Sequence, residues 1–249
     1  MTIPSLEATG KVVVVTGGSK GLGRAMALGF GEAGADVVVA SRKLEACEVM
    51  ADEIRSMGRR ALAVAAHVGD WDQCATLIDA TVAEFGRIDV LVNNAGIAPV
   101  PPSLLDVTRD LFDKTIGVNL RGPLRLTALA AEHMPRGGSV INISSTASLH
   151  PSSVTVVYAA AKAGLNALTK ATATEFGPRG IRVNAIVCGT FHTDSLHASL
   201  PSEDLRAQMA ARVSLGRIAS ADEIVGTALY LASDASSYMT GELIVLDGG

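Results

Sequence analysis

A short run of β-branched residues leads directly into a glycine-rich turn near the start of the chain. Val12-Val13-Val14-Val15 is typical of a buried strand. It is followed by Thr16-Gly17-Gly18-Ser19-Lys20-Gly21-Leu22-Gly23 and then by a helix-compatible stretch, residues 24–33. A strand, a glycine-rich turn and a helix in this order aim free backbone N–H groups at a phosphate. Such a turn can also be purely structural, but its place at the start of an α/β chain favours a nucleotide site.

Strand-like and helix-like segments alternate along the rest of the chain. Residues 88–92 and 140–145 are typical of strands, and the runs 37–39 and 181–187 suit buried parallel strands. No linker, repeat or low-complexity segment divides the 249 residues. We therefore predict one doubly wound α/β domain over residues 1–249, with helices on both faces of a parallel sheet. Ligands bind beyond the carboxyl ends of such strands, so the glycine turn, Asn94, Ser145 and the stretch after Val187 are expected to converge there.

Composition supports a large core and argues against several classes of protein. Hydrophobic residues make up 48% of the chain, and its formal net charge of −4 comes without a basic block, which argues against nucleic-acid binding. No apolar stretch approaches the roughly 20 residues that span a bilayer, and residues 1–10 lack the pattern of a signal peptide. The three cysteines, Cys47, Cys74 and Cys188, have unrelated spacings, which favours a reduced cytosol. No set of His, Cys, Asp or Glu has metal-ligand spacing.

Tyr158 and Lys162 are four residues apart, and Ser145 lies thirteen residues before the tyrosine. On a helix, residues four apart share one face, so the ammonium of Lys162 can approach the phenol. A unit charge about 4 Å away, at an effective dielectric near 20, is worth roughly 4 kcal/mol. We therefore expect the pKa of Tyr158 to fall from near 10 toward neutrality, where a general acid or base works best. The pair can arise by chance, and it gains weight from the motifs around it.

Taken together, these motifs resemble the short-chain dehydrogenase/reductase family. The resemblance rests on Thr16-Gly-x-x-x-Gly-x-Gly23, Asn93-Asn-Ala-Gly96, Asn119, Ser145, Tyr158-x-x-x-Lys162 and Leu246-Asp-Gly-Gly249, in the family's order over the whole chain. The branch resembled is the single-domain one that includes 3-oxoacyl carrier-protein reductases and many carbonyl and alcohol dehydrogenases. It implies a Rossmann-type sheet of about seven strands and an oxidoreductase that uses a nicotinamide cofactor.

The resemblance also implies a role for each catalytic residue. Tyr158 would be the general acid in carbonyl reduction and the base in alcohol oxidation. Lys162 would lower the pKa of Tyr158 and hydrogen-bond the nicotinamide ribose. Ser145 would hold the substrate oxygen and stabilise its developing charge, whereas Ser144 should face the other side of the strand. Asn119 would hold a water behind Lys162 for proton relay, a role compatible with a local break in its helix.

The expected cofactor site takes in the glycine turn, the ends of the second and third strands and the loop after the sixth. Its residues are Gly17, Ser19, Lys20, Gly21, Leu22, Gly23, Ser41, Arg42, His67, Val68, Asn94, Ala95, Gly96, Gly189, Phe191 and Thr193, with Tyr158 and Lys162. No carboxylate follows the second strand, where NAD-preferring relatives place one. Lys20 and Arg42 can instead meet a 2′-phosphate. We therefore expect NADP(H), with NAD(H) as the alternative if both are ordinary surface cations.

Two positions depart from the family pattern. After the third strand, His67-Val68 stands where many relatives have Asp-Val, whose Asp contacts the adenine amino group. His67 either contacts the adenine or is an ordinary strand-end residue. After the sixth strand, Cys188-Gly189 replaces the usual Pro-Gly, and Cys188 is either a packing variant or a redox-sensitive thiol.

The substrate pocket and the oligomeric state are less constrained. The expected pocket walls are Leu149, His150 and Val154, the loop 97–102, and an excursion over about 190–215 that carries Phe191, His192, Leu196, His197, Leu200 and Met209. That excursion is either a lid or a fixed surface helix. The helix after Tyr158 is rich in alanine, at Ala159, Ala160, Ala161, Ala163, Ala167, Ala171 and Ala173. The family usually forms homotetramers through helices here and the last strand, although alanines also suit a monomer's helix.

The sequence thus predicts an NADP(H)-dependent oxidoreductase that moves a hydride between nicotinamide and a carbonyl or secondary alcohol. One alternative is an NAD(H)-dependent alcohol dehydrogenase of the same family. Another is a nucleotide-binding regulator without turnover, and a third is a sugar-nucleotide epimerase or dehydratase. Relatives of that last kind usually carry an added C-terminal substrate domain.

Overall fold

Seven parallel strands form the centre of the computed structural model, which describes residues 5–193, 196 and 202–249. The strands are β1 (Val12–Thr16), β2 (Asp36–Ser41), β3 (Ala61–Ala65), β4 (Val90–Asn93), β5 (Gly138–Ser145), β6 (Ile181–Cys188) and β7 (Leu243–Leu246). Their order in the sheet is β3-β2-β1-β4-β5-β6-β7, and all neighbours are parallel. The prediction of a doubly wound Rossmann-type sheet is confirmed.

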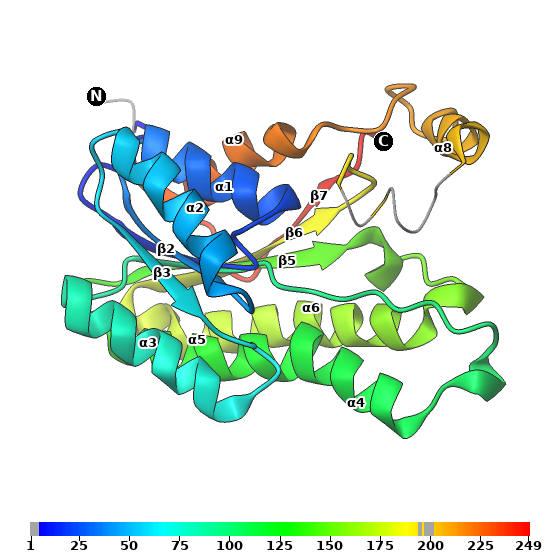
Figure 1. Cartoon of the computed structure of the whole chain (residues 1–249), viewed down its shortest axis with the longest axis horizontal. Coiled ribbons are helices and arrows are strands. Elements are labelled where there is room, and N and C mark those ends of the chain that lie inside the picture. Colours follow the sequence, from blue (N-terminus) through cyan, green and yellow to red (C-terminus); the bar gives the residue numbers. More distant parts are fainter. Residues whose placement is uncertain (1–4, 194–195, 197–201) are drawn as a thin grey trace.

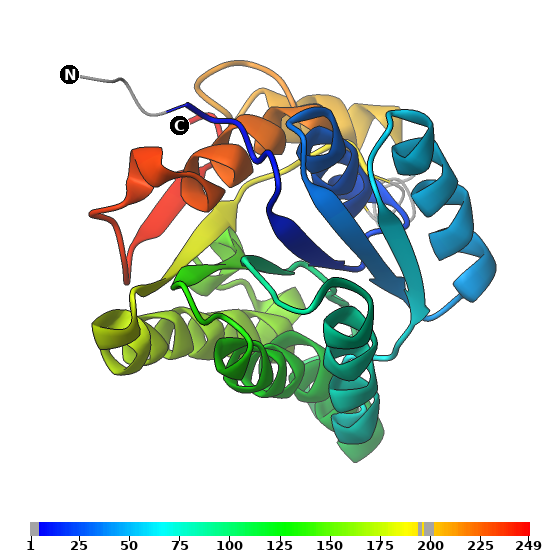
Figure 2. The same cartoon turned by 90° about the vertical axis from the view of Figure 1, so that its left-hand side faces the viewer.

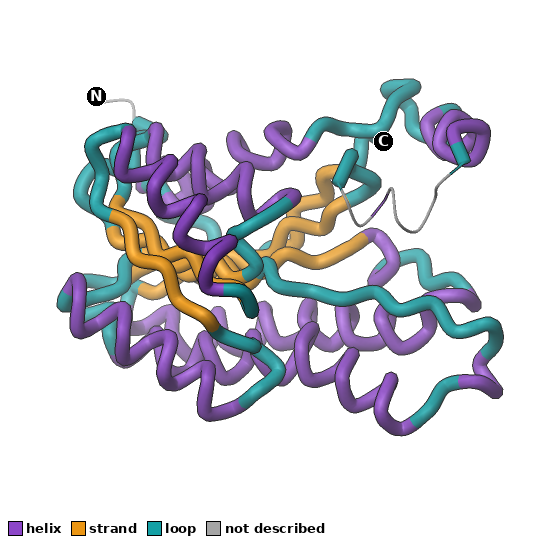
Figure 3. Tube along the Cα trace, viewed as in Figure 1, coloured by secondary structure: helices purple, strands orange, loops and turns teal. Residues whose placement is uncertain are grey.

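Helices cover both faces of this sheet, as Figures 1 and 2 show. One face carries α1 (Gly21–Glu32), α2 (Leu44–Ser56) and α9 (Val225–Ala232); the other carries α3 (Trp71–Phe85), α4 (Arg109–Ile116), α5 (Gly122–Glu132) and α6 (Val156–Phe176). A single π-helical turn, η2 (Gly117–Arg121), joins α4 to α5. Helix α8 (Glu203–Ala210) lies apart from these layers, beyond the sheet (Figure 3). Within the described residues, no helix combines the length and apolarity that crossing a bilayer requires.

The core follows from the period-two alternation of the strands. In β1, Val13 and Val15 pack with Phe30 on the α1 side of the sheet. Val14 points the other way and packs in the cluster that contains Leu126 of α5. All five residues of β1 are buried, which explains why its sequence is continuously apolar rather than alternating. Each fully buried side chain of this size contributes about 1.5–3 kcal/mol to folding.

The chain reverses its direction of winding between β1 and β4, which creates a crevice at the carboxyl ends of the strands. The glycine turn follows β1 there, and Asn94 follows β4. Ser145 ends β5 and stands in register with Cys188, which ends β6. Strand order and register therefore bring four distant segments to one edge of the sheet, as the sequence predicted.

Candidate active site

A cavity of about 400 Å³ opens at this edge of the sheet. It is lined by Gly17, Lys20, Gly21, Leu22, Asn94, Ala95, Gly96, Ile97, Ala98, Ile143, Ser144, Ser145, Tyr158, Lys162, Cys188, Gly189, Thr190, Phe191, Thr193 and Leu196. The structure thus brings together the glycine turn, the segment after β4, three of the four expected catalytic residues and the loop after β6. The expected cofactor residues Ser19, Gly23, Ser41, Arg42, His67 and Val68 lie outside its lining, as does Asn119.

The glycine turn is tight enough to exclude side chains at two positions. Gly17 has φ +63°, a left-handed conformation that favours glycine, and a Cβ on Gly23 would lie 2.2 Å from the carbonyl oxygen of Gly17. Asn94 braces the turn, because its Nδ2 donates to the carbonyl oxygens of Thr16, at 2.8 Å, and Gly17, at 3.2 Å.

The start of α1 is suited to an anion. Its N-cap residue, Lys20, makes no side-chain capping bond, and its first turn contains no acidic residue. The first N–H groups of a helix have no partner within the helix, and its dipole favours negative charge there. Thr193 lies against this point, 3.4 Å from where a Cβ on Gly21 would be. The close backbone and the uncapped helix fit the phosphates of a dinucleotide.

Lys162 lies beneath the cavity, and its side chain is held by the end of β5. Its Nζ donates to the carbonyl oxygen of Ile143 at 2.7 Å and lies 5.8 Å from the centre of the Tyr158 ring. The side chain is only 4% exposed. Burial disfavours the charged form and lowers the pKa of Lys162 to about 8. Lys162 is therefore still a cation at neutral pH, although less firmly than a surface lysine.

Tyr158 does not show the lowered pKa that we expected from its spacing to Lys162. Its pKa is raised, first because burial penalises the phenolate; the Ser145 hydroxyl acts in the opposite direction, and Cys188 adds a smaller upward effect. The expectation assumed that a nearby cation would dominate, whereas loss of hydration dominates here. In this structure Tyr158 is a protonated phenol at neutral pH.

Asn119 occupies the π-helical turn between α4 and α5 and is completely buried. Its Nδ2 donates to the carbonyl oxygens of Ile97, at 2.8 Å, and Thr115, at 2.9 Å, and its Oδ1 accepts from the Ile97 N–H at 3.3 Å. The side chain therefore fixes the loop after β4 against the helix. The expected local break in the helix is present, since a π turn widens the regular hydrogen-bond ladder.

Two polar residues of the site were assigned no role from the sequence. Thr16 closes β1, and its Oγ1 accepts from the N–H groups of Asn94, at 3.0 Å, and Ala95, at 3.1 Å. Asn166 lies one turn beyond Lys162 and accepts a 2.6 Å hydrogen bond from Ser144 Oγ. The available signals were a threonine just before the first glycine and an asparagine four residues after the lysine. The Ser144 bond shows that this hydroxyl is directed at α6.

Cys188 is a buried thiol at the end of β6, 5% exposed. Burial raises the pKa of Cys188 to about 12, and the nearby Lys162 only partly offsets that rise. A thiol of this kind is protonated and poorly nucleophilic at neutral pH. Its environment favours the packing interpretation over a redox-sensitive one.

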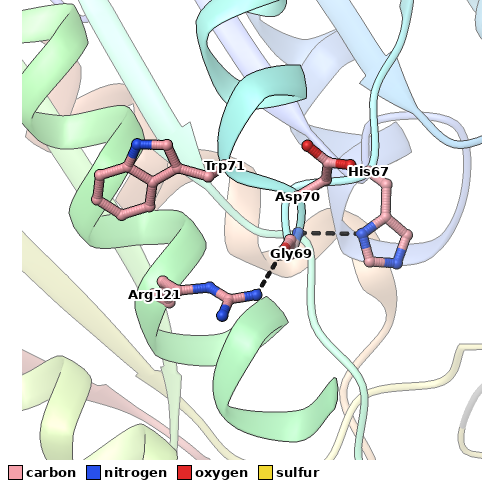
Figure 4. A pocket seen from close by; sticks show the side chains of 5 residues that line it. All are labelled: His67, Gly69, Asp70, Trp71 and Arg121. Carbon is pink, nitrogen blue, oxygen red and sulfur yellow. Dashed lines mark hydrogen bonds between the residues drawn. The ribbon is translucent and has the colours of Figure 1, made fainter. Parts of the chain in front are cut away.

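His67 lies just beyond β3, in a second cavity that it shares with Gly69, Asp70, Trp71 and Arg121 (Figure 4). Its Nδ1 accepts a 3.1 Å hydrogen bond from the Gly69 N–H. In the neutral ring the proton therefore sits on Nε2, which can donate. Where relatives place an accepting carboxylate, this chain presents a ring nitrogen of the opposite polarity.

The end of β2 and the residue after it carry Ser41 and Arg42, two of the expected cofactor residues. Ser41 Oγ lies 3.0 Å from Cys47 Sγ at the start of α2. Arg42 is exposed, and among the described residues its guanidinium forms no ion pair with a carboxylate. Val68 is buried, and its carbonyl oxygen would lie 2.4 Å from a Cβ on Gly122.

The expected substrate walls are only partly described. Leu149, His150 and Val154 are exposed after β5. In the excursion over about 190–215, Phe191 is buried and Thr190 Oγ1 donates to Met209 Sδ of α8 at 3.3 Å. His197 and Leu200 lie outside the described residues.

Comparison with known proteins gives a consistent set of relatives. Residues 17–249 match a family model described as enoyl-(acyl carrier protein) reductase. The chain is 40% identical over 246 residues to L-rhamnose 1-dehydrogenase (NAD(P)(+)) of Azotobacter vinelandii, covering 96% of each chain. It is 36% identical over 246 residues to 3-oxoacyl-[acyl-carrier-protein] reductase of Thermotoga maritima, covering 98% of this chain and 99% of the relative.

A solved structure agrees with these relatives. The crystal structure of a short-chain type dehydrogenase/reductase from Mycobacterium marinum superposes with a TM-score of 0.91 at 38% identity. The match covers 98% of this chain and 96% of the other. The likeness therefore extends over nearly the whole chain.

Proposed function

The chain belongs to the short-chain dehydrogenase/reductase family, whose members are NAD(P)-dependent oxidoreductases, and from that premise we propose an NADP(H)-dependent enzyme that interconverts a carbonyl and a secondary alcohol. The observation that carries the proposal is the shared cavity. Ser145 and Tyr158 line the same space as the uncapped start of α1 and the segment Asn94-Ala95-Gly96. A dinucleotide lying along that space would present its reactive ring to the serine and the tyrosine.

Ser145 and Tyr158 have different roles in the proposed reduction of a carbonyl. When bound, the reduced nicotinamide supplies a hydride to the carbonyl carbon. Ser145 donates a hydrogen bond to the carbonyl oxygen and stabilises its developing charge. Tyr158 gives that oxygen a proton, which completes the alcohol and leaves a tyrosinate beside the cation of Lys162. Tyr158 carries its proton at neutral pH, as a general acid must.

Lys162 and Asn119 would return the proton to Tyr158. Lys162, with a pKa of about 8, can give up a proton near neutrality and regain it from water. Both side-chain atoms of Asn119 are already hydrogen-bonded. In the proposed relay, the water would therefore be held by the backbone of Asn119 in the π turn, where the regular helical hydrogen bonding is interrupted.

Replacing Tyr158 with phenylalanine tests the proposed chemistry. The Tyr158→Phe variant keeps the ring and loses only the hydroxyl, so we expect kcat to fall at least about 100-fold, the lower end of what a positioned acid contributes. Cofactor affinity, measured by nicotinamide fluorescence, should change less than about twofold, because the glycine turn and α1 are untouched. A variant that kept wild-type turnover would refute the role of Tyr158, and loss of cofactor binding would indicate a structural role.

We propose that the enzyme prefers NADP(H) because of Lys20 and Arg42. Both are exposed, and Arg42 follows directly on the end of β2. A guanidinium can grip a 2′-phosphate through two parallel hydrogen bonds, and an ammonium adds a point charge. The Arg42→Asp variant should lose at least tenfold in affinity for NADPH, about 1.4 kcal/mol, and little for NADH. Equal losses for both cofactors would overturn the preference, and Arg59→Asp, on the turn before β3, is the control.

We also propose a homotetramer in the cytosol. Its support is the family membership, an exposed alanine stripe on α6 and the three thiols, which are all free. Free buried thiols suit a reducing compartment.

A further inference from the structure

We propose that the substrate is an uncharged ketone or secondary alcohol with an apolar body, held by one oxygen and disfavoured when it carries a carboxylate, a phosphate or several hydroxyls. The inference rests on the proposed function, because it names the substrate class of the same cavity. It is carried by three observations on the described walls of that cavity: their charges, their polar side chains and the apolar residues at their outer ends.

The described walls offer no partner for a charged substrate. Among the described lining residues, only Lys20 and Lys162 are charged. Lys20 precedes α1 in the phosphate cradle, and Lys162 Nζ is bonded to the carbonyl oxygen of Ile143. From the lining residues Ala98 and Ser145 the chain runs on through residues 99–105 and 146–157, which contain no Asp, Glu, Lys or Arg and one histidine, His150. A substrate carboxylate would lose its hydration there without gaining a cation.

Among the described residues that line the cavity, most polar side chains outside the Ser145 and Tyr158 pair are already hydrogen-bonded within the chain. The bonded pairs are Asn94 with Thr16 and Gly17, Ser144 with Asn166, Thr190 with Met209, and Thr193 with Leu196. Ser145 Oγ accepts from the Ala147 N–H at 3.2 Å and still has a proton to donate, and with the Tyr158 hydroxyl it suits a single oxygen. A sugar would bury further hydroxyls without partners, and each hydrogen bond to water lost in this way weakens binding.

The two segments that lead away from the cavity lining expose apolar side chains to water. They follow the adjacent strands β4 and β5 (Figure 1), and their exposed residues are Val100, Leu104, Leu105, Leu149, Val154 and Val156. Leu105 is 96% exposed. Contact with an apolar ligand would remove such surface from water, which favours binding.

Two ketones that differ in one substituent test this class. The first is 4-tert-butylcyclohexanone and the second is 4-oxocyclohexanecarboxylate, each assayed with NADPH; L-rhamnose with NADP⁺ represents the polyhydroxylated class. We expect kcat/KM for the tert-butyl ketone to exceed that for the carboxylate at least about 30-fold, within the range that pocket contacts discriminate. L-Rhamnose should be poorer still.

A charge placed on the wall should reverse the preference. Ala98 is exposed and lines the cavity, so the Ala98→Arg variant would offer a carboxylate partner there. We expect the ratio of the two kcat/KM values to fall at least about tenfold, as for a charge-assisted hydrogen bond. Val49→Arg, on the exposed side of α2, should leave the ratio unchanged.

Calorimetry of both ketones with the enzyme–NADP⁺ complex separates the two proposals. Binding of the tert-butyl ketone but not of the carboxylate, without turnover of either, would refute the proposed function and leave only the preference of the cavity for an uncharged apolar ligand standing. Turnover that favours the carboxylate or L-rhamnose would overturn the substrate class and leave the function standing. Binding of neither ketone would also overturn the substrate class.

A separate network supports a second inference: we infer that Asn166 is a positioning residue for Ser145. Asn166 lies on α6 and is 7% exposed. Its Oδ1 accepts from Ser144 Oγ at 2.6 Å, and its Nδ2 donates to Ser148 Oγ at 2.8 Å. Ser148 Oγ in turn donates to the carbonyl oxygen of Ser145 at 2.6 Å. Asn166 thus clamps the residues on both sides of Ser145 to the helix that carries Tyr158.

Removing the clamp should displace the serine without unfolding the chain. For Asn166→Leu we expect kcat to fall about tenfold to 100-fold, since small misplacements cost rates of that size. The phenol of Tyr158 should titrate at higher pH, because it loses the lowering effect of Ser145; its absorbance, assigned by difference from Tyr158→Phe, reports this without turnover. Thr169→Val is the control, because Thr169 is equally buried on α6 but bonded to Asn142.

A conservative change adds a pH signature. In Asn166→Asp the protonated carboxyl can still donate to Ser148, whereas the carboxylate can only accept. Its kcat should therefore fall as the pH rises through the pKa of the new carboxyl, a step that the wild type lacks. If Asn166→Leu changed neither kcat nor the Tyr158 titration, or if Thr169→Val changed them equally, Asn166 would be merely structural.

Discussion

At the scale of single residues, the site is governed by burial rather than by the charge of neighbours. Lys162 and Tyr158 were brought together by their spacing, as the sequence predicted, yet both have pKa values shifted toward their neutral forms. Spacing along a helix can be read from a sequence, but the water lost around a side chain depends on the whole fold. That is why the location of the pair was predictable and the direction of the Tyr158 pKa was not.

Lys162 should therefore cost the protein stability. Because its folded-state pKa of about 8 lies below its ordinary value of 10.5, burying the charged form is unfavourable by up to about 3 kcal/mol at neutral pH. The Lys162→Met variant keeps the volume and removes the charge, but it leaves the carbonyl oxygen of Ile143 without its donor, a loss of about 1 kcal/mol. We expect a net gain of about 1–2 kcal/mol at pH 7, measured by chemical denaturation.

The lowered pKa of Lys162 also predicts how the free energy of unfolding changes with pH. Between about pH 8 and 10.5 the unfolded chain keeps the Lys162 proton and the folded chain releases it, so wild-type stability rises with pH relative to the variant. The advantage of Lys162→Met should be full below pH 8 and should shrink toward pH 10.5. A variant that was less stable at pH 7, by an amount independent of pH, would show that the Ile143 bond outweighs the cost of burial.

At the scale of elements, the cofactor cradle is a contact between two loops rather than a property of the glycine turn alone. The order of strand, turn and helix was readable from the sequence, whereas the brace from Asn94 to the carbonyl oxygens of Thr16 and Gly17 was not. It joins residues 77 and 78 positions apart, and it requires β1 and β4 to be neighbours. Sequence patterns fix local elements, and the sheet order then determines which loops meet.

A methyl group at Gly23 should open this contact. Its Cβ would lie 2.2 Å from the Gly17 carbonyl oxygen and 2.5 Å from Asn94 Nδ2, so the turn must shift. We expect Gly23→Ala to destabilise the fold by about 1–3 kcal/mol and to weaken NADPH binding at least about tenfold. The matched control is Gly226→Ala in α9, where nothing lies within 4 Å of the new Cβ and stability should instead rise by about 0.4–1 kcal/mol. Tight NADPH binding by Gly23→Ala would mean that the turn does not form the cradle.

At the scale of the whole molecule, the structure divides the alanines of α6 into two groups. Ala159, Ala161 and Ala173 are buried within the chain. Exposed alanines occupy one face at intervals of three or four residues, at Ala160, Ala163, Ala167 and Ala171. These groups could not be separated from the sequence alone, because helix propensity and core packing both favour alanine. On an outer face, small residues allow another helix to approach closely.

The apolar surroundings of this stripe support its use as an interface with a second copy of the chain. Helices α4 and α5 pack beside α6, and they expose Phe112 and Leu124. At the sheet edge, β7 is partly exposed, with Val245 48% accessible. Two such surfaces on one protomer permit a closed tetramer with two kinds of contact.

Light scattering on a sizing column should therefore give four times the 25.6 kDa of one chain. Ala167→Arg places a long cation in the middle of the alanine stripe while keeping a good helix former, so we expect dimers or monomers that still bind NADPH. Val49→Arg, exposed on α2 at the opposite face of the sheet, should leave the tetramer intact. A monomeric wild type would refute the proposed tetramer. A tetrameric Ala167→Arg variant would show that the alanine stripe is not the interface, and the β7 edge would then be the next surface to mutate.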